Sequence, residues 1–457
     1  MVKTYLQLAD QISRKIARGD LPVGSRLKPQ REFAYDQGIA VSTASRVYEE
    51  LRRRGLASGE VGRGTYVSNR FSPLDPALQE AKNTAIDLEI VFRSDAKSLK
   101  ELASSAASKL AAGISPDEAA PPAAKASQSM SEALQTFYPS ANLLTNAGGV
   151  FLAGSGKQAL IAAMAALVPR GGRIAVEALT YPFVLSAARL LGIDLVPLAL
   201  DEEGIIPSAL ENAASVGLNG VYLQPVLQSP LVLSMSNSRR KEIAAILVRN
   251  NLTAIEDRIY GFLSNLKPLA NEAPDNTIVI DSLSKRMMPG LTVGVILASD
   301  KHQEAIAQSL RAGGWMAPSL TVALAKNWIE DGTVQAIQTR KRAEAAKMFA
   351  AANEAFSDLE FHGSAEALHG WLNLPNPWRG DAFAATCAKV GIAVTPGRDF
   401  AVLSGNAPAA VRIAFSATDM ETWKLALSEI ARIAASHPAN FHEIQSDGGT
   451  VSHSQTS

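Results

Sequence analysis

The chain has 457 residues, of which 47% are hydrophobic and 19% are charged, and its formal net charge is zero. This length predicts two or three globular domains, and no apolar run approaches a membrane span or follows a basic start as in a signal peptide. The single cysteine, Cys387, excludes an internal disulfide and a cysteine metal cluster. We therefore expect a cytoplasmic protein with no membrane partner and no metal site.

The charge is unevenly distributed along the chain. Residues 1–70 hold 13 Lys and Arg against 7 Asp and Glu, a balance of +6, so the remaining residues carry −6. Such an asymmetry is typical of a nucleic-acid-binding module fused to a ligand-binding body. A modest basic excess also fits an ordinary solvated face.

Three short helices are predicted in the basic segment. The first has an apolar stripe with a spacing of four residues, the second, QREFAYDQ, stops at Gly38, and the third ends at Gly55. Ser42 is a suitable N-cap for the third helix. This is helix-turn-helix spacing, and it leaves Ser42, Thr43 and Arg46 together on the outer face, where they can read a major groove.

Two short strands joined by a Gly-Arg-Gly turn follow in LASGEVGRGTYV. Because the glycines, Gly64 among them, allow a close approach of the backbone, Arg63 can reach a minor groove or a phosphate. A winged helix-turn-helix over residues 1–70 is therefore the predicted head. A small three-helix interaction domain is the alternative.

Residues 71–145 predict a linker and a partly helical connection, with a break at DEAAPPAAKAS. An α/β pattern begins at Gly149. The strand VFLAG precedes the helix SGKQALIAAMAAL, which places Ser155, Gly156 and Lys157 at a helix N-terminus. Backbone N–H groups and the helix dipole bind anions there, although a Ser-Gly helix start is also routine capping.

The strand-like run LTAIED ends at Asp257, and Tyr260 follows one helical turn later. Pyridoxal phosphate acts as an electron sink only if a carboxylate keeps its ring nitrogen protonated, and a phenol near the ring oxygen helps to tune it. The pair therefore suits a pyridine cofactor. A helix-capping aspartate beside a core tyrosine is the alternative.

Lys285 lies in DSLSKRMMPGLTVG, on a turn between the strand-like runs TIVID and TVGVILA. Desolvation between packed strands lowers a lysine pKa and so supplies the neutral amine that imine formation needs. A solvated surface lysine is the alternative.

SLSK followed by PGL, with ED, two residues and YG upstream, resembles the lysine and aspartate blocks of fold-type I aminotransferases across residues 150–420. With the winged-helix pattern in front, the whole chain resembles the MocR subgroup of the GntR-family transcription regulators. The resemblance implies an α/β fold with a large domain over residues 146–325 and a small α+β domain over residues 326–438. The polar tail, residues 439–457, is expected to be disordered.

The resemblance also implies roles for matched residues. It implies that Lys285 holds pyridoxal 5'-phosphate as an aldimine, that Tyr181 stacks on the ring, and that Ser229 donates to a ring oxygen. Ser284 belongs to the same lysine block. Arg412, in VRIAFS, resembles the arginine that fixes a ligand α-carboxylate.

Three further positions carry the resemblance or depart from it. Arg31, in PQREFA, belongs to the matched head. Ser229 stands where relatives usually have asparagine, and Thr292 stands where many have an arginine that neutralises the phosphate. We expect Lys157, helped by Arg286, to supply that missing charge.

The chain is thus expected to be a DNA-binding transcriptional regulator that senses pyridoxal phosphate or an amino compound at Lys285. Its expected partners are a double-stranded DNA operator, a small amino compound or vitamin B6 as effector, and a second copy in a homodimer. The alternatives are an aminotransferase with a DNA-binding head and a regulator whose body is a cofactor-free dimerisation scaffold. We expect no physiological turnover beyond a residual aminotransferase-type half-reaction, since turnover needs a narrow geometry whereas sensing needs only differential affinity.

Overall fold

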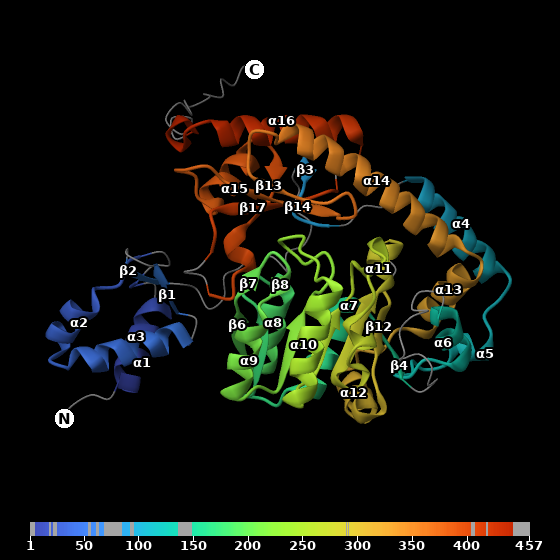
Figure 1. The fold of residues 1–457 in the computed structure, drawn as a ribbon, viewed down its shortest axis with the longest axis horizontal. Coiled ribbons are helices and arrows are strands. Elements are labelled where there is room, and N and C mark those ends of the chain that lie inside the picture. Colours follow the sequence, from blue (N-terminus) through green and yellow to red (C-terminus); the bar gives the residue numbers. More distant parts are fainter. Residues whose placement is uncertain are drawn as a thin grey trace, which may run out of the picture. The chain divides into compact units, whose positions relative to one another are not determined.

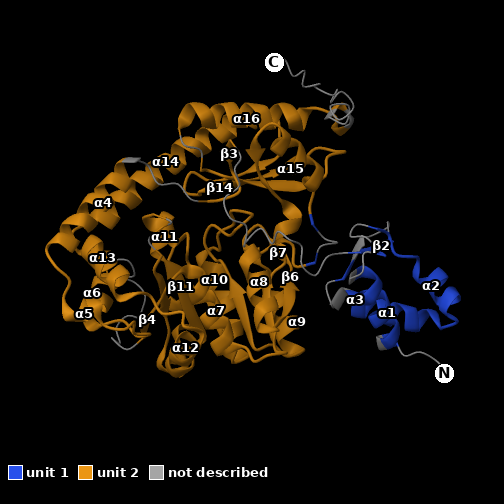
Figure 2. Ribbon diagram, turned by 180° about the vertical axis from the view of Figure 1, so that it is seen from behind, with its two compact units in different colours: residues 1–80, 403–407 blue, residues 81–402, 408–457 orange. Residues whose placement is uncertain are grey.

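The computed structural model describes residues 5–17, 20–21, 25–53, 56–60, 64–67, 85–91, 96–135, 149–288, 290, 292–403, 407–416 and 419–441. The chain divides into two compact units, one of residues 1–80 and 403–407 and one of residues 81–402 and 408–457 (Figure 2). The wing residue Arg63 and the tail beyond residue 441 lie outside the described residues.

The first unit contains the three predicted helices and the predicted strand pair. These are α1 (Tyr5–Ala17), α2 (Gln30–Gln37), α3 (Val41–Arg53), β1 (Ala57–Glu60) and β2 (Gly64–Val67), with β1 antiparallel to β2. Apolar residues of all five elements pack in one small core, among them Leu8, Val47, Leu51 and Val67, with Phe33 of α2 packed against it. Gly38 ends α2 in the left-handed conformation, with φ 62°.

Ser42 does not cap α3, so that detail of the prediction is wrong. The helix begins one residue earlier, at Val41, and the carbonyl of Ala40 accepts the backbone N–H of Thr43 at 3.0 Å. A capping residue needs a non-helical backbone, which the second residue of a helix does not have. Ser42 and Arg46 are exposed, as predicted, and Thr43 is half-buried.

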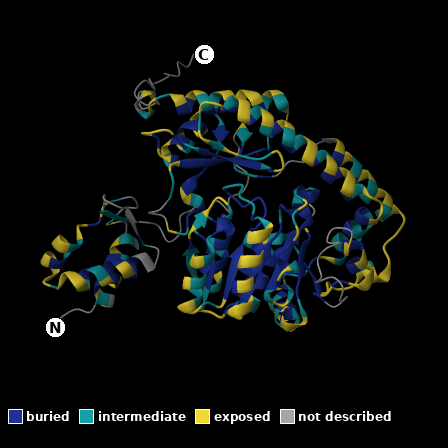
Figure 3. Cartoon of the chain, viewed as in Figure 1, coloured by how far each residue is buried: buried dark blue, intermediate teal, exposed yellow. Residues whose placement is uncertain are grey.

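The large sheet of the second unit has seven strands. They are β4 (Val150–Ala153), β5 (Arg173–Glu177), β6 (Asp194–Leu198), β9 (Gly220–Leu223), β10 (Ala254–Asp257), β11 (Thr277–Ser282) and β12 (Gly294–Leu297), in the order β4-β12-β11-β10-β9-β5-β6. β12 is antiparallel to both of its neighbours, and the other pairs are parallel. The central strands are buried on both faces, which explains their continuous apolar runs (Figure 3).

Helices lie on both faces of this sheet (Figure 1). They are α7 (Gly156–Leu167), α8 (Pro182–Leu191), α9 (Pro207–Ser215), α10 (Asn237–Arg249) and α12 (Asp300–Gly313), while the short α11 (Leu283–Arg286) connects β11 to β12. A small hairpin pairs β7 (Leu200–Asp201) with β8 (Gly204–Ile205). Short 3-10 turns follow at Gly261–Leu263, Leu269–Asn271 and Pro274–Asn276.

A smaller sheet follows in the chain, in the order β13-β14-β17-β16. Its strands are β13 (Phe361–His362), β14 (His369–Asn373), β16 (Thr395–Pro396) and β17 (Ala410–Ala414). The helices that follow α12 in the chain are α13 (Ser319–Glu330), α14 (Thr333–Ala355), α15 (Gly380–Lys389) and α16 (Met420–Ala435), with 3-10 turns at Gly397–Phe400 and Pro438–Phe441. Of these, α13 packs in the core that includes β4 and β12. Large apolar side chains such as Phe383 and Trp423 fill the core between the sheet and its helices.

The connection predicted over residues 71–145 is partly helical where it is described. It contains α4 (Ala96–Ala111), α5 (Pro116–Ala119) and α6 (Gln128–Gln135), and α6 adds Met130 and Leu134 to the core that also includes β4 and β12. β3 (Ile86–Asp87) pairs in parallel with β15 (Ile392–Ala393), so this segment reaches the smaller domain. Of the helices that are described, none has the length and apolarity needed to cross a bilayer.

Candidate functional site

Three adjacent parallel strands end in buried polar residues. Glu177 is the last residue of β5, Gln224 directly follows β9, and Asp257 is the last residue of β10. The carboxyl ends of parallel strands meet at one edge of a sheet, which is where α/β folds bind ligands. The candidate site is built on this edge.

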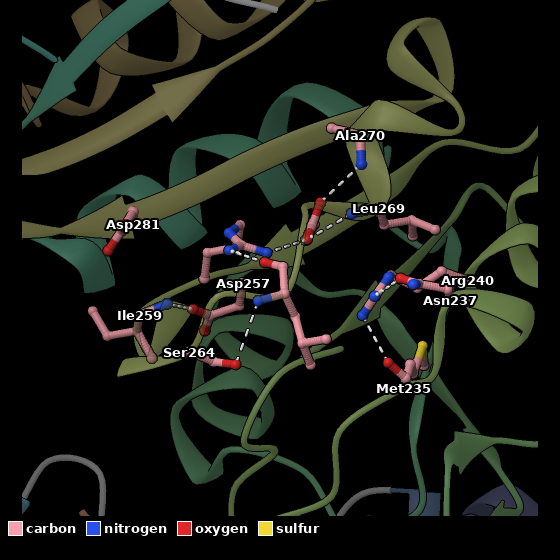
Figure 4. A network of polar contacts seen from close by, with 12 residues as sticks. Met235, Asn237, Arg240, Asp257, Ile259, Ser264, Leu269, Ala270 and Asp281 are labelled. Atoms are coloured by element: carbon pink, nitrogen blue, oxygen red, sulfur yellow. Dashed lines mark hydrogen bonds and ion pairs between the residues drawn. The ribbon is translucent and has the colours of Figure 1, made fainter. Parts of the chain in front are cut away.

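Asp257 is held by three hydrogen-bond donors. Its Oδ2 accepts the Tyr222 hydroxyl at 2.7 Å and Gln224 Nε2 at 3.2 Å. Its Oδ1 accepts the backbone N–H of Ile259 at 2.9 Å (Figure 4). Burial raises the pKa of Asp257 to about 6, against the opposing effect of these donors. Oδ1 keeps acceptor capacity for one more donor, so the carboxylate fits a protonated pyridine nitrogen.

Lys285 lies on α11, where the sequence predicted a turn. Its amine donates to the carbonyl of Val91 at 2.5 Å. Burial, followed by the charges of Arg412, Lys341 and Lys157, holds the pKa of Lys285 well below its ordinary value. A half-buried amine of this kind favours the neutral, nucleophilic form that condenses with an aldehyde.

Both ends of α11 are fixed by hydrogen bonds. Ser282 is the N-cap, and its Oγ accepts the backbone N–H of Ser284 at 3.2 Å. At the other end, Nζ of Lys341, from α14, donates to the carbonyls of Lys285 and Met287 at 2.8 Å each. A cation at a helix C-terminus is favourable, and here it holds the backbone that carries Lys285.

The start of α7 is the predicted phosphate-binding position. Ser155 is the N-cap, and its Oγ accepts the backbone N–H of Gln158 at 3.1 Å. A Cβ at Gly156 would lie 2.9 Å from Cβ of Ser282, so only glycine fits there. Lys157 is exposed, and its amine lies 5.0 Å from the ring centroid of Phe183. The first-turn N–H groups and Lys157 suit a phosphate.

Arg286 is engaged elsewhere. It is buried and forms an ion pair with Asp281, and its guanidinium lies 5.2 Å from the ring centroid of Phe262. Its charge is therefore already compensated by Asp281. Of the two cations expected to act on a phosphate, only Lys157 keeps that assignment.

The two site tyrosines differ in their surroundings. Tyr181 is half-buried at the N-terminus of α8, with its ring 6.2 Å from that of Phe183. Tyr260 is buried, its ring lies 5.4 Å from His369, and burial raises its pKa to about 12, so the phenol stays protonated. The helical turn expected between Asp257 and Tyr260 is a non-helical turn instead, followed by the 3-10 turn that begins at Gly261.

Arg412, on β17, is only 7% exposed. Its Nη1 donates to Ser229 Oγ at 3.3 Å, its Nη2 donates to the carbonyl of Glu89, and its guanidinium lies 4.9 Å from the ring centroid of Phe400. Its Nε has no hydrogen-bond partner among the described residues. A buried guanidinium held by uncharged groups fits the carboxylate of a ligand.

Arg412, Lys157 and Asp257 lie close enough to Lys285 for their charges to affect the pKa of its amine, so these four predicted residues of the body lie together. A pocket beside Lys285 is lined by Lys341, Glu344 and apolar side chains, with about 400 Å³ of empty space, open solvent included. Within the described ranges, no group of His, Cys, Asp or Glu could hold a metal ion.

The predicted DNA-reading residues belong to the first unit. Arg31, Ser42 and Arg46 are exposed there. The guanidinium of Arg46 lies 4.3 Å from the ring centroid of Tyr5, so the charged group itself contacts α1 while the residue stays exposed. Gly64 has φ 120°, a conformation that side chains rarely adopt.

Sequence reasoning missed five residues of the site. Glu177 and Gln224 carry the same signal that identified Asp257, a polar residue at the end of a buried strand, and this signal could have found them. Tyr222, Val91 and Lys341 carry no such signal. Val91 and Lys341 contact Lys285 across 194 and 56 residues of chain, which no local pattern can indicate.

Comparison with known proteins places these features in a family. Residues 92–430 match the family described as aminotransferase class I and II. The uncharacterized HTH-type transcriptional regulator YdeF of Bacillus subtilis strain 168 is 28% identical over 418 residues, which cover 90% of each chain. The HTH-type pyridoxine biosynthesis transcriptional regulator PdxR of Corynebacterium glutamicum is 24% identical over 438 residues, 93% of this chain and 94% of that protein.

Solved structures share the fold of the body. The crystal structure of an archaeal alanine:glyoxylate aminotransferase matches with a TM-score of 0.70 and 21% identity, covering 79% of this chain and 93% of that one. The predicted fold-type I body is confirmed, as is the resemblance to regulators that join a helix-turn-helix head to it. The cofactor of this fold family is pyridoxal 5'-phosphate, and the geometry around Asp257 and Lys285 fits it. The chain belongs to the aminotransferase class I and II family.

Proposed function

We propose that this chain is a DNA-binding transcriptional regulator whose aminotransferase-like body binds pyridoxal 5'-phosphate at Lys285 and senses the cofactor or an amino compound. It acts in the cytoplasm on a double-stranded DNA operator, as a homodimer. One observation carries the proposal: a lysine amine of depressed pKa shares a buried site with a three-donor aspartate, in a chain that begins with a helix-turn-helix.

When bound, pyridoxal phosphate supplies an aldehyde that condenses reversibly with primary amines and a ring that withdraws electrons. Lys285 presents the neutral amine. Asp257 accepts the ring N–H at Oδ1, and Tyr260 presents a protonated phenol. The remaining roles follow from position: Ser155, Gly156 and Lys157 at the phosphate, Tyr181 on the ring face, Ser229 and Ser284 as hydroxyl donors, and Arg412 at a ligand carboxylate.

Sensing is favoured over turnover by the state of Ser229. Its hydroxyl already accepts Arg412 Nη1, and it is shorter than the asparagine usual at this position. A loosely held ligand reacts slowly, because the catalytic rate depends on a narrow geometry. The same ligand can still shift the protein between two conformations, because that needs only a difference in affinity. A cofactor-free scaffold is disfavoured because burial lowers the pKa of both Lys285 and Arg412, and because the Nε of Arg412 has no hydrogen-bond partner among the described residues.

The proposal is tested by DNA binding with and without the cofactor. DNA fragments are selected from a random-sequence library with the full-length protein, and their affinities are then measured in both conditions. A coupling typical of allosteric proteins changes the affinity about 5-fold or more, and Lys285→Ala abolishes that response. Cofactor binding without any response of the DNA affinity would refute sensing, and transamination at ordinary enzyme rates would favour the aminotransferase alternative.

A further inference from the structure

The side chain of Gln224 bridges two parts of the candidate site. It is 2% exposed. Its Nε2 donates to Asp257 Oδ2 at 3.2 Å, and its Oε1 accepts the backbone N–H of Ser229 at 3.0 Å. Its own backbone N–H donates to Glu177 Oε1 at 3.1 Å, which holds the residue at the end of β9.

The orientation of this amide is determined by its partners. An ionised aspartate only accepts hydrogen bonds, and a backbone N–H only donates them. A flipped amide would place its oxygen against the Asp257 carboxylate and its nitrogen against the Ser229 N–H. Gln224 therefore contacts both groups in one orientation, and movement of either group affects its bond to the other.

Ser229 continues the chain of contacts to Arg412, whose Nη1 donates to Ser229 Oγ at 3.3 Å. The four residues thus run without a gap from the carboxylate-binding guanidinium on β17 to the aspartate on β10. Among hydrogen bonds, the 3.3 Å contact is long, so an anion at Arg412 can compete with it.

The loop that carries Ser229 is strained. Leu227 and Val232 adopt φ values of 50° and 62°, a left-handed conformation that branched side chains rarely take. Gln228 holds the loop against this strain, because its Oε1 accepts the Leu231 N–H at 3.0 Å and its Nε2 donates to the Leu179 carbonyl at 2.6 Å. Strained segments of this kind persist only where their surroundings hold them, and they gather at functional sites.

We propose that Gln224 is a positioning residue that couples a carboxylate bound at Arg412 to Asp257, and through Asp257 to the ring end of the cofactor. The inference rests on the proposed function. A carboxylate that draws Arg412 Nη1 away from Ser229 shifts the strained loop, and Gln224 passes the shift to Oδ2 of Asp257. By linkage, the cofactor changes the affinity for the carboxylate by the same factor.

The probe is propionate, which carries a carboxylate but no amine. The affinity of the full-length protein for pyridoxal phosphate is measured by its visible absorption, in propionate and in chloride of equal ionic strength, and the ratio of the two affinities reports the coupling. We expect a ratio of about 5-fold or more in the wild type, the low end of allosteric couplings. Gln224→Met, which keeps the volume and removes both bonds, brings the ratio close to one.

Two variants separate coupling from stability. Gln224→Glu keeps the acceptor for the Ser229 N–H but has no donor for Asp257, so it also loses the ratio. Asn276→Ala is the matched control. It removes a part-buried hydrogen bond of a side-chain amide, from Nδ2 to the Leu252 carbonyl at 2.7 Å, at the opposite end of the sheet. This control keeps the ratio even if it lowers the melting temperature.

A double-mutant cycle tests the path itself. Ser229→Ala removes the contact with Arg412, and we expect Ser229→Ala combined with Gln224→Met to have no smaller ratio than Gln224→Met alone. The inference is overturned if Gln224→Met keeps the wild-type ratio, if Asn276→Ala loses it, or if the wild type binds pyridoxal phosphate without responding to propionate. A wild type that binds no pyridoxal phosphate overturns the proposed function, and the inference with it.

Discussion

The head and the body present their candidate ligand contacts in opposite ways. In the head, Arg31 and Arg46 are exposed, so their charges act at long range and are screened by salt. In the body, Asp257, Lys285 and Arg412 are buried or half-buried, and burial is the main cause of the shifted pKa of each. Removing one buried group leaves its partners unsatisfied, whereas removing one exposed charge leaves the rest of the surface intact.

The largest effect is expected at Asp257, a buried charge of the body. Asp257→Asn removes the buried negative charge while it keeps the shape of the side chain, so the ring nitrogen loses its ionic partner. We expect the affinity for pyridoxal phosphate to fall by on the order of 100-fold, as for other truncated buried charge pairs. Fluorescence titration measures it, and an affinity within about 3-fold of the wild type would contradict the assignment of Asp257.

An intermediate effect is expected in the head. Arg46→Ala removes a contact to DNA and lowers the affinity for a selected fragment by about 10-fold, with a weaker salt dependence if the contact is to a phosphate. Arg63→Ala is expected to act in the same direction. The cofactor absorption of both variants should match that of the wild type; loss of it would mean that the two regions do not act separately.

Lys157 combines features of both regions, since it is an exposed charge at a site in the body. Lys157→Ala is expected to weaken pyridoxal phosphate binding by about 3- to 10-fold at low ionic strength and by less at high salt, because an exposed charge is screened. Titrations at two salt concentrations test this. An unchanged affinity at low salt would leave the phosphate to the helix N-terminus alone.

The last effect is on stability rather than on binding, and it is a slope in pH at Glu177. Burial raises the pKa of this carboxyl to about 8 from an ordinary 4.5. The folded state therefore resists ionisation: this contribution to stability is complete below about pH 4.5 and is lost as the pH rises toward 8, by up to about 1.4 kcal/mol per pH unit. Glu177→Gln removes the slope. The melting temperature of this variant should therefore rise relative to that of the wild type as the pH increases from about 4.5 to about 8. A constant difference would contradict the shift.

The sequence was most informative where chemistry and periodicity coincide. Asp257 and Lys285 stand out because Asp257 is the last residue of a buried strand and Lys285 follows another within one short turn of helix. Gly38 stops α2 because it adopts the left-handed conformation. Ser42 was misassigned because a capping residue and a first-turn residue differ only in backbone angles. The contacts of Lys341 and Gln224 depend on tertiary packing and on loop conformation, which local patterns do not encode.

The most direct test of cofactor binding at Lys285 is the visible absorption spectrum of the purified protein with added pyridoxal phosphate, beside Lys285→Ala treated identically. In the wild type we expect a band of protein-bound cofactor that shifts when an amino compound binds, and in the variant we expect no such band. The same band in both proteins would remove Lys285 from the site. No band in either would contradict the central claim that the body binds pyridoxal phosphate.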